Sequence, residues 1–568
     1  MTTRRDFLAT TSLALVSPLL GARHGHLHGH TQLLPADAGR SRLPATAWLP
    51  NAMPGDALRA LATHAINAAK EAGATYADVR VAERHSMTML LSPAEPRLPQ
   101  PRLEVTVSYG VRVVVDGASA FVYGSTPSPD AVAAAARNAV RTARGYARRD
   151  AQKTTHRIEL APIPVVTGEW TTPHELDPFT VPLEDHAAVL GAYRAASIRV
   201  AHGRDTPGFG VNLDWTREQR VFASTEGALV TQMLFSSAPS MLVMGNFGLG
   251  GSGISLTSLM IPDLMPMSGG FETVTNPARQ DSIKRVTEEA VQLASLPRRM
   301  VDVGRYPVVF DGMTFGAILG QTVGPALELD RVAGFERDAG GDSFLKLSTL
   351  GTQIASPLLS VTANRTPPSV VAVQWDDDGV APREYTCIRD GRLVDYHTSR
   401  QTAPILDDWY KTQGIPRRSN GCAVAPHADY PVMVRAPHLT VAPTARTASL
   451  AELCRDLGRG LLIRGMPHVS TDQQFVSASM SLRNSEFGAC EMFEIERGVP
   501  VRSIHGNAVE FATSKFLKAL VALGDATTTQ STALSFYKGN PWKGALQSVT
   551  APAAVVKELN VIAEDIQL

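Results

Sequence analysis

Four histidines near the N-terminus are of a type and spacing that could bind metal ions. They stand at every second position, as His24, His26, His28 and His30. Neutral imidazoles bind zinc, copper or nickel, so a flexible tract of this kind could scavenge such ions. A defined site needs rigid geometry and supporting hydrogen bonds, which an alternating tract does not supply. We therefore favour a solvated linker.

A glycine-rich run, Gly248-Leu249-Gly250-Gly251-Ser252-Gly253, has the spacing of a dinucleotide-binding loop. Such a loop must open a helix, because the amide ends of the helix hold the phosphate. Pro262 and Pro266 follow too closely for a helix of useful length. The run is better interpreted as a loop between strands. An exported cofactor-binding oxidoreductase remains a less favoured alternative.

Other catalytic motifs are weak or absent, since the sequence contains no GxSxG, HExxH or P-loop pattern. His174-Glu175 resembles the start of a zinc helix, but nearby prolines break it, which indicates a solvated loop. His427 and His438 could offer metal ligands. Lone histidines near turns are more often exposed or hydrogen-bonded, so this interpretation is not favoured.

Length and composition indicate an ordinary globular protein that can bury at least two cores. The 568 residues are 44% hydrophobic and 19% charged, and 54 basic residues balance 54 acidic ones. Without an excess of positive charge, a nucleic-acid partner is disfavoured. The cysteines contain no CxxC pair and therefore indicate neither a zinc ribbon nor a disulfide framework. They are Cys387, Cys422, Cys454 and Cys490.

The start of the chain resembles a twin-arginine export signal. Arg4 and Arg5 precede Phe7, Leu8 and a modestly apolar stretch that ends near Ala22. This resemblance implies folding in the cytoplasm and release to the periplasm or the outside. The stretch is shorter than the roughly 20 residues of a membrane-spanning helix. We expect no membrane span after the signal is removed.

The periodicity of the remaining chain predicts an α+β fold. A helix-flanked sheet comes first, strands and turns follow, and a larger β-rich mixed part ends the chain. The predicted helices are 56–72, 128–146, 281–295, 449–457 and 514–523, and the first strands or hairpins are 76–91 and 105–123. The predicted divisions are 1–30 for the signal and His-rich linker, 50–155 for an N-terminal α/β domain, 156–300 for a middle domain and 301–568 for a β-rich domain.

Several short blocks follow one another in a definite order. They include Tyr109-Gly110-Val111-Arg112-Val113, Ser224-Thr225-Glu226-Gly227, Trp375-Asp376-Asp377-Asp378-Gly379 and Phe493-Glu494-Ile495-Glu496-Arg497-Gly498. Each block alone is unspecific, but their order resembles the TldD/PmbA family, also called modulators of DNA gyrase, over nearly all of residues 55 to 565. The resemblance implies a zinc peptidase that acts on small or unfolded peptides in a closed cavity, formed by an active subunit and a related subunit without the metal.

The family resemblance also locates the expected zinc site. In active subunits, two histidines of an HExxxH helix and a C-terminal cysteine hold zinc, and the glutamate acts as base. The matching segment here is 320–330, with Gly320 and Pro325 at the histidine positions and Gln321 at the glutamate position. None of these three side chains can replace the residue that the family has there.

The third ligand is missing as well, because no cysteine occurs in 535–538, where the resemblance places it. Glu328 and Asp330 keep the family pattern, but two carboxylates without histidine would bind zinc weakly at best. We therefore expect no cofactor in this chain, and zinc in active relatives only.

These observations favour a non-catalytic subunit that binds peptides or pairs with an HExxxH relative or with a second copy. The alternative is an active hydrolase of the same family that uses other residues. Its cavity candidates are Asp376, Asp377, Asp378, Arg417, Arg418 and Asn420. We favour the simpler interpretation that 376–378 is an acidic turn and 417–420 a basic turn, both on the surface.

Overall fold

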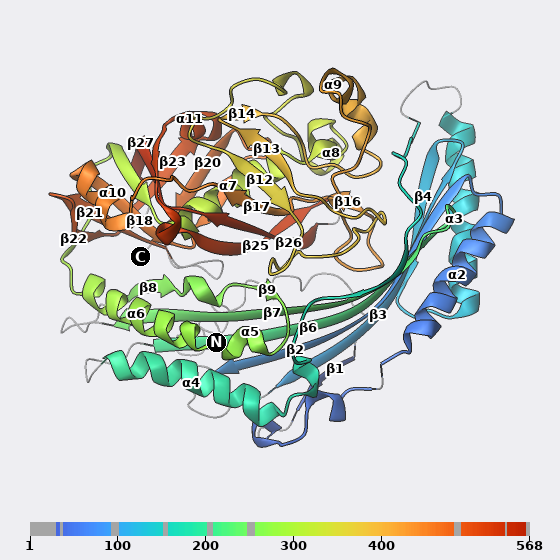
Figure 1. Ribbon diagram of the computed structural model, residues 1–568, viewed down its shortest axis with the longest axis horizontal. Coiled ribbons are helices and arrows are strands. Elements are labelled where there is room, and N and C mark those ends of the chain that lie inside the picture. Colours follow the sequence, from blue (N-terminus) through green and yellow to red (C-terminus); the bar gives the residue numbers. More distant parts are fainter. Residues whose placement is uncertain are drawn as a thin grey trace, which may run out of the picture.

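The computed structural model describes most of the chain outside its N-terminal segment. The described residues are 30–34, 38–50, 52–91, 101–150, 157–201, 208–246, 256–481, 490–539 and 542–563. Within them the strands form a nine-stranded, a ten-stranded and a six-stranded sheet and a two-stranded ribbon. Figure 1 shows the first sheet as a long curved layer, with the C-terminal half of the chain against its concave face. The predicted α+β fold class is confirmed.

Long antiparallel strands build the curved sheet, in the order β1-β3-β2-β6-β7-β5, with β4 beside β3 and both β8 and β9 beside β7. The strands are β1 (His30–Leu33), β2 (Tyr76–Leu91), β3 (Arg102–Val115), β4 (Ala118–Gly124), β5 (Thr167–Thr171), β6 (Gly208–Ser224), β7 (Leu229–Asn246), β8 (Leu256–Met260) and β9 (Met267–Ser268). β2 is one continuous strand that pairs with β6 from Asp78 to Leu91. The sheet thus spans the predicted N-terminal and middle regions, and the domain boundaries themselves stay a prediction.

The helices α2 (Gly55–Glu71), α3 (Pro129–Asp150) and α4 (Leu183–Ala201) cover the convex face of this sheet, and α6 (Pro277–Ala294) lies along its edge at β7 and β8 (Figure 1). The predicted helices 56–72 and 128–146 are confirmed as α2 and α3, and the helix at 281–295 as α6. A helix that the sequence did not predict, α4, packs against α6 and β6. Pro182 lies just before its first residue, outside the helix interior, where a proline would break the helix.

The two faces of β2 are buried in different ways. Successive side chains of a strand point to opposite faces. Val79 and Val81 pack under α2 and α3 in an apolar core. Asp78 and Arg80 point the other way and are also fully buried, because the C-terminal half covers them. The sequence predicted a half-buried strand here, and the second layer makes it a buried one.

Two sheets enclose the helix α7 (Gly312–Ala326) in the C-terminal half. The ten-stranded sheet contains β10 (Arg298–Arg299), β11 (Gly304–Phe310), β18 (Arg459–Gly465), β19 (His468–Thr471), β20 (Ser477–Ser481), β21 (Cys490–Glu496), β22 (Val499–Ile504), β23 (Asn507–Ala512), β24 (Leu520–Leu523) and β27 (Ala554–Ala563). The six-stranded sheet contains β12 (Val361–Asn364), β13 (Tyr385–Arg389), β14 (Arg392–Leu393), β17 (His438–Val441), β25 (Gln530–Lys538) and β26 (Lys543–Ala551). The ribbon pairs β15 (Ala423–Val424) with β16 (Met433–Val434).

The remaining helices of the described residues are short. They are α5 (Glu272–Thr275), α8 (Leu329–Val332), α9 (Asp407–Thr412), α10 (Leu450–Leu457) and α11 (Thr513–Lys518). The helix predicted at 449–457 is confirmed as α10, which Ser449 caps. The helix predicted at 514–523 is wrong in its second half, because 520–523 form β24 and pair with β27. None of the helices in the described segments is both long and apolar enough to cross a membrane.

Arginines of the curved sheet meet aspartates of the C-terminal half at a buried junction. The guanidinium of Arg112 lies 2.7 Å from a carboxylate oxygen of Asp378 and also binds Asp78. Arg220 donates to Asp377 at 2.6 Å. The expectation of a surface turn at 376–378 is wrong, because all three aspartates are nearly inaccessible. This junction holds the two layers in register.

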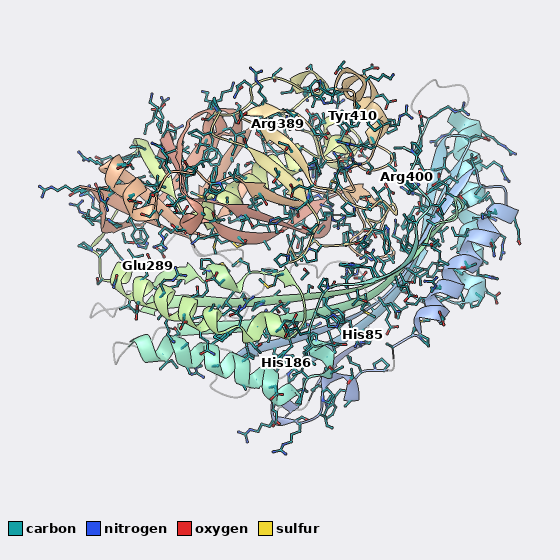
Figure 2. The ribbon with its side chains drawn as sticks, in the orientation of Figure 1. His85, His186, Glu289, Arg389, Arg400 and Tyr410 are labelled. Atoms are coloured by element: carbon teal, nitrogen blue, oxygen red, sulfur yellow. The ribbon has the colours of Figure 1, made fainter. Side chains whose placement is uncertain are left out.

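Arg400 extends the junction from the C-terminal side. Figure 2 shows it where the C-terminal half meets the curved sheet. Its guanidinium donates to the carbonyl of Ala161 at 2.8 Å and to the hydroxyl of Tyr76 at 3.2 Å. These bonds join segments that are far apart in the sequence.

Replacing Arg112 by Met should lower the free energy of unfolding by about 3 to 5 kcal/mol, because two buried carboxylates lose their main counter-ion. Denaturant unfolding would measure the loss. Arg305→Met is the matched control, since the Arg305–Glu558 pair is 68% and 51% exposed and its removal should cost less than about 1 kcal/mol. Equal losses in both variants would contradict the role of the junction.

Candidate functional site

α7 carries the three positions at which the family resemblance expects two ligands and a base. The helix begins after Asp311, whose carboxylate accepts a hydrogen bond from the N–H of Thr314 at 2.8 Å. Its residues are small or apolar and almost all are buried, as expected for a helix enclosed between two sheets. Pro325 lies in the last turn, where it has no N–H to donate to the carbonyl of Gln321, and its ring offers no donor to a metal.

Side chains of the six-stranded sheet fill the space beside Gly320. A Cβ atom at this position would lie 2.9 Å from a methyl group of Leu534 and 3.1 Å from one of Val549. The side-chain amide of Gln547 donates to the backbone carbonyl of Gly320. Helix and sheet therefore approach more closely here than a histidine side chain would allow.

Gln321, at the position of the base, links α7 to the start of β19. Its amide nitrogen donates to the carbonyls of Pro467 at 3.3 Å and Ala317 at 3.4 Å. Its amide oxygen accepts from the N–H of Val469 at 3.3 Å. A neutral amide held by three backbone groups has a structural role in this arrangement.

The ammonium of Lys538 occupies the space between Glu328 and Asp330. Its Nζ lies 2.9 Å from Glu328 Oε2, 2.6 Å from Asp330 Oδ1 and 3.0 Å from the carbonyl oxygen of Val434. Lys538 ends the segment 535–538, in which the family resemblance leads one to expect a cysteine. The chain thus has a buried cation of its own beside these two carboxylates.

The remaining oxygens of this cluster are also bound. Glu328 Oε1 accepts from the N–H of Ala436, and Asp330 Oδ2 accepts from the N–H of Val434, both at 3.1 Å. Burial tends to raise the pKa of Glu328, but the charges of Lys538 and Arg331 outweigh it and hold that pKa below its usual value. Both carboxylates are therefore committed to partners within the chain.

His397 is the imidazole that the fold brings beside Glu328, and no sequence pattern pointed to it. The two residues form a backbone bridge, and His397 Nδ1 lies 2.6 Å from the hydroxyl of Tyr385. Burial lowers the pKa of His397 to about 4, so the ring is neutral at pH 7. Across the described residues, no three His, Cys, Asp or Glu side chains are grouped so that they could hold a metal ion.

A cavity of about 700 Å³ lies between the concave face of the curved sheet and the C-terminal half. Its floor is a grid of side chains from neighbouring strands: Arg84, Ser86 and Thr88 of β2, Arg102, Glu104 and Thr106 of β3, Asp214, Thr216, Glu218 and Arg220 of β6, and Leu234 and Ser236 of β7. The opposite wall includes Ser535 and Tyr537 of β25 and the segments 370–373 and 424–427. In the sequence, polar residues at every second position of β2, Arg84, Ser86 and Thr88, were the signal from which the cavity floor could have been predicted.

Charges on the cavity floor are largely paired with one another. Arg84 and Arg220 each donate to Glu218 at 2.6 Å. Burial raises the pKa of Glu218, but the two arginines outweigh it and lower that pKa to about 2. His427 lies 3.2 Å from Arg84, and burial together with this cation lowers its pKa to about 3. Serine and threonine hydroxyls of the floor, including Ser86 and Thr216, lie around these ion pairs.

The six residues suggested by sequence as cavity candidates do not line this cavity. Asp376, Asp377 and Asp378 belong to the junction behind its wall, where Asp376 accepts three backbone N–H bonds. Arg417 pairs with Asp407 and Glu159. Arg418 is half-buried, and Asn420 is buried and donates to Asp395 at 3.1 Å. The basic run therefore supports local structure.

The other sequence candidates are dispersed. Of the two lone histidines, His427 borders the cavity, whereas His438 lies on β17 and binds the hydroxyl of Ser548 at 2.8 Å. His174 lies in a loop, as predicted, and binds the carbonyl of Thr172. All four cysteines are buried and unbridged. The twin arginines, the glycine run 248–253, His24, His26 and His28 lie outside the described residues, and His30 begins β1.

Solved structures of low sequence identity share this fold. A proposed modulator of a DNA gyrase from Thermotoga maritima has a TM-score of 0.64 and 14% identity, over 89% of this chain and 99% of that one. TldE from Thermococcus kodakarensis has a TM-score of 0.62 and 14% identity, over 89% and 100%. A proposed modulator of DNA gyrase from Bacteroides thetaiotaomicron has a TM-score of 0.62 and 16% identity, over 89% and 99%.

Sequence comparisons agree with the fold. A curated metalloprotease from Methanothermobacter thermautotrophicus is 28% identical over 252 residues, which are 43% of this chain and 48% of that protein, so the chain spans about half the length of this relative. A family model of the PmbA/TldA metallopeptidase C-terminal domain matches residues 303–563, and a model of domain 1 matches residues 98–143. The chain therefore belongs to the PmbA/TldD metallopeptidase family.

Proposed function

We propose that this chain is a non-catalytic member of its family that binds peptides and serves as a partner subunit of a peptidase. The observation that carries the proposal is the filled space at the expected zinc site. Leu534 and Val549 press against Gly320, and Lys538 neutralises Glu328 and Asp330. The residues present do not fit zinc, because they offer neither two imidazoles nor a thiolate to it.

The cavity supports the peptide-binding part of the proposal. Its volume of about 700 Å³ lies in the range of about 300 to 1,000 Å³ that ligand sites usually have. Serine and threonine hydroxyls on the floor, including Ser86 and Thr216, can both donate to and accept from the backbone of an extended peptide. The partner would be an HExxxH-containing relative or a second copy, and the export signal would place the complex in the periplasm or outside.

Purified mature protein should contain far less than one zinc per chain and should show no chelator-sensitive hydrolysis of unfolded peptides. The triple variant Gly320→His, Gln321→Glu, Pro325→His should not restore either property, because Leu534 and Val549 leave no room for the first imidazole. Metal analysis and a peptidase assay would check this. Stoichiometric zinc with activity in the unmodified protein would refute the proposal.

Gly320→His alone should lower the free energy of unfolding by about 1 to 3 kcal/mol, as overpacking of a buried contact does. Gly145→His is the matched control, because a Cβ at Gly145 of α3 has no neighbour within 4 Å. Thermal or denaturant unfolding of both variants would compare the two sites. Equal destabilisation of the Gly145→His control would contradict this explanation. It would show that histidine lowers stability through its effect on the helix itself and not through the contact of α7 with the six-stranded sheet.

Peptide binding should require the free volume of the cavity. Ser86→Trp, at the centre of the floor, should abolish binding of a fluorescent unfolded peptide measured by anisotropy, whereas Ala60→Trp on the outer face of α2 should leave it unchanged. Co-purification from the native host would identify the partner subunit. Normal binding by a folded Ser86→Trp variant would exclude this cavity as the peptide site.

A further inference from the structure

Two carboxyl groups on one face of β6 have opposite environments. Asp214 and Glu218 are four residues apart, so both point into the cavity, about 13 Å from each other along the strand. Glu218 is held by two arginines, as described above. Within the described part of the chain, no Lys, Arg or His forms an ion pair with Asp214, and its two bonding partners are both uncharged.

Those two partners fix the carboxyl of Asp214 at the cavity floor. The hydroxyl of Thr88 donates to its Oδ1 at 2.6 Å, and the amide of Asn212 donates to its Oδ2. Thr88 lies directly opposite Asp214 in the pairing of β2 with β6. The nearest cation of the same row is Arg102 on β3, and it pairs with Glu104 at 3.7 Å. The carboxyl is thus oriented and half-buried, and none of the described residues forms an ion pair with it.

Burial raises the pKa of Asp214 to about 6, while the bonds from Thr88 and Asn212 oppose this rise. A carboxyl with this pKa is mostly ionised at pH 7 and mostly protonated at pH 5, because its charge is desolvated and has no charged partner. A cation brought into the cavity by a ligand would supply the missing partner. Carboxyl pairs whose pKa values are driven apart by their surroundings commonly have different roles.

We propose that Asp214 is the receptor for a primary ammonium group of a bound peptide, either its N-terminus or a lysine side chain. This inference rests on the proposed function, since it assigns an anchor within the same cavity. The ammonium would donate charge-assisted hydrogen bonds to the two carboxylate oxygens. Ser86 and Thr216, in the next row of the floor, would then lie beside the first peptide groups.

Calorimetry with a C-terminally amidated Ala-Leu-Phe tripeptide tests the assignment. Acetylation of its amine should weaken binding by about tenfold to a hundredfold, the usual effect of removing a charged hydrogen bond. An acetylated peptide with lysine in place of alanine identifies the source of the ammonium. If its affinity returns to that of the free tripeptide, the site also accepts lysine side chains. If its affinity stays at that of the acetylated tripeptide, the site accepts only the N-terminus. Equal binding of the free and acetylated tripeptides overturns the inference but leaves the proposed function intact, whereas failure of both to bind refutes both.

The Asp214→Asn variant should bind the free and acetylated tripeptides equally, at the affinity of the acetylated one. Asp281→Asn on α6 is the matched control, since its side chain is 76% exposed and outside the cavity, and it should retain the preference for the free amine. A preference for the free amine that persists in a folded Asp214→Asn variant would overturn the assignment.

A measurement on the unmodified protein avoids any effect of substitution on folding. Between pH 7 and pH 5 the affinity for the free tripeptide should fall about tenfold as the carboxyl is protonated, while the affinity for the acetylated one stays constant. The other titratable or charged groups that face Asp214 are Arg84 of β2, Arg102 and Glu104 of β3, Glu218 and Arg220 of β6, and Arg365, His427 and Tyr537 across the cavity. A parallel fall for the acetylated peptide would assign the pH effect to these groups and overturn the inference.

Discussion

The junction between arginines of the curved sheet and aspartates of the C-terminal half is the interaction on which the remaining structure depends. Arg112 and Arg220 lie mostly buried on a strand face that would otherwise be in water, and Asp378 and Asp377 of the C-terminal half compensate their charge together with Asp78 and Glu218 of the sheet itself. Pairs of this kind add little net stability, but they allow one geometry and reject others. They fix how the curved sheet lies over the second layer, and with it the cavity between them.

α7 occupies the place at which the family resemblance expects a zinc site. The helix lies between the two sheets and is capped by Asp311, and backbone N–H groups of Ala436 and Val434 donate to Glu328 and Asp330. Small residues at 320 and 324 let β25 and β26 close against it. Lys538 then supplies positive charge to these two carboxylates. Packing and charge around this helix are therefore satisfied by residues of the chain itself.

The cavity floor separates structural charges from an unpaired one. Glu218, Arg84 and Arg220 satisfy one another and continue into the junction through Asp377. Among the described residues, the bonding partners of Asp214, on the same strand face, are the uncharged Thr88 and Asn212. This difference arises from the register of the strands. Each residue of β6 lies opposite different residues of β2 and β7, and these neighbours determine whether its charge is paired.

The sequence by itself determined the fold class, the family, the first helices and strands, and the residue types at the expected zinc site, because these depend on local periodicity and on the order of short blocks. It did not predict α4 or β24, whose identity depends on packing and strand pairing. Burial of Asp376 to Asp378, the contact of Lys538 with Glu328, and the isolation of Asp214 were decided only by tertiary structure. Each depends on residues more than a hundred positions apart, and the charge and solvation of a side chain follow from such neighbours rather than from its own segment.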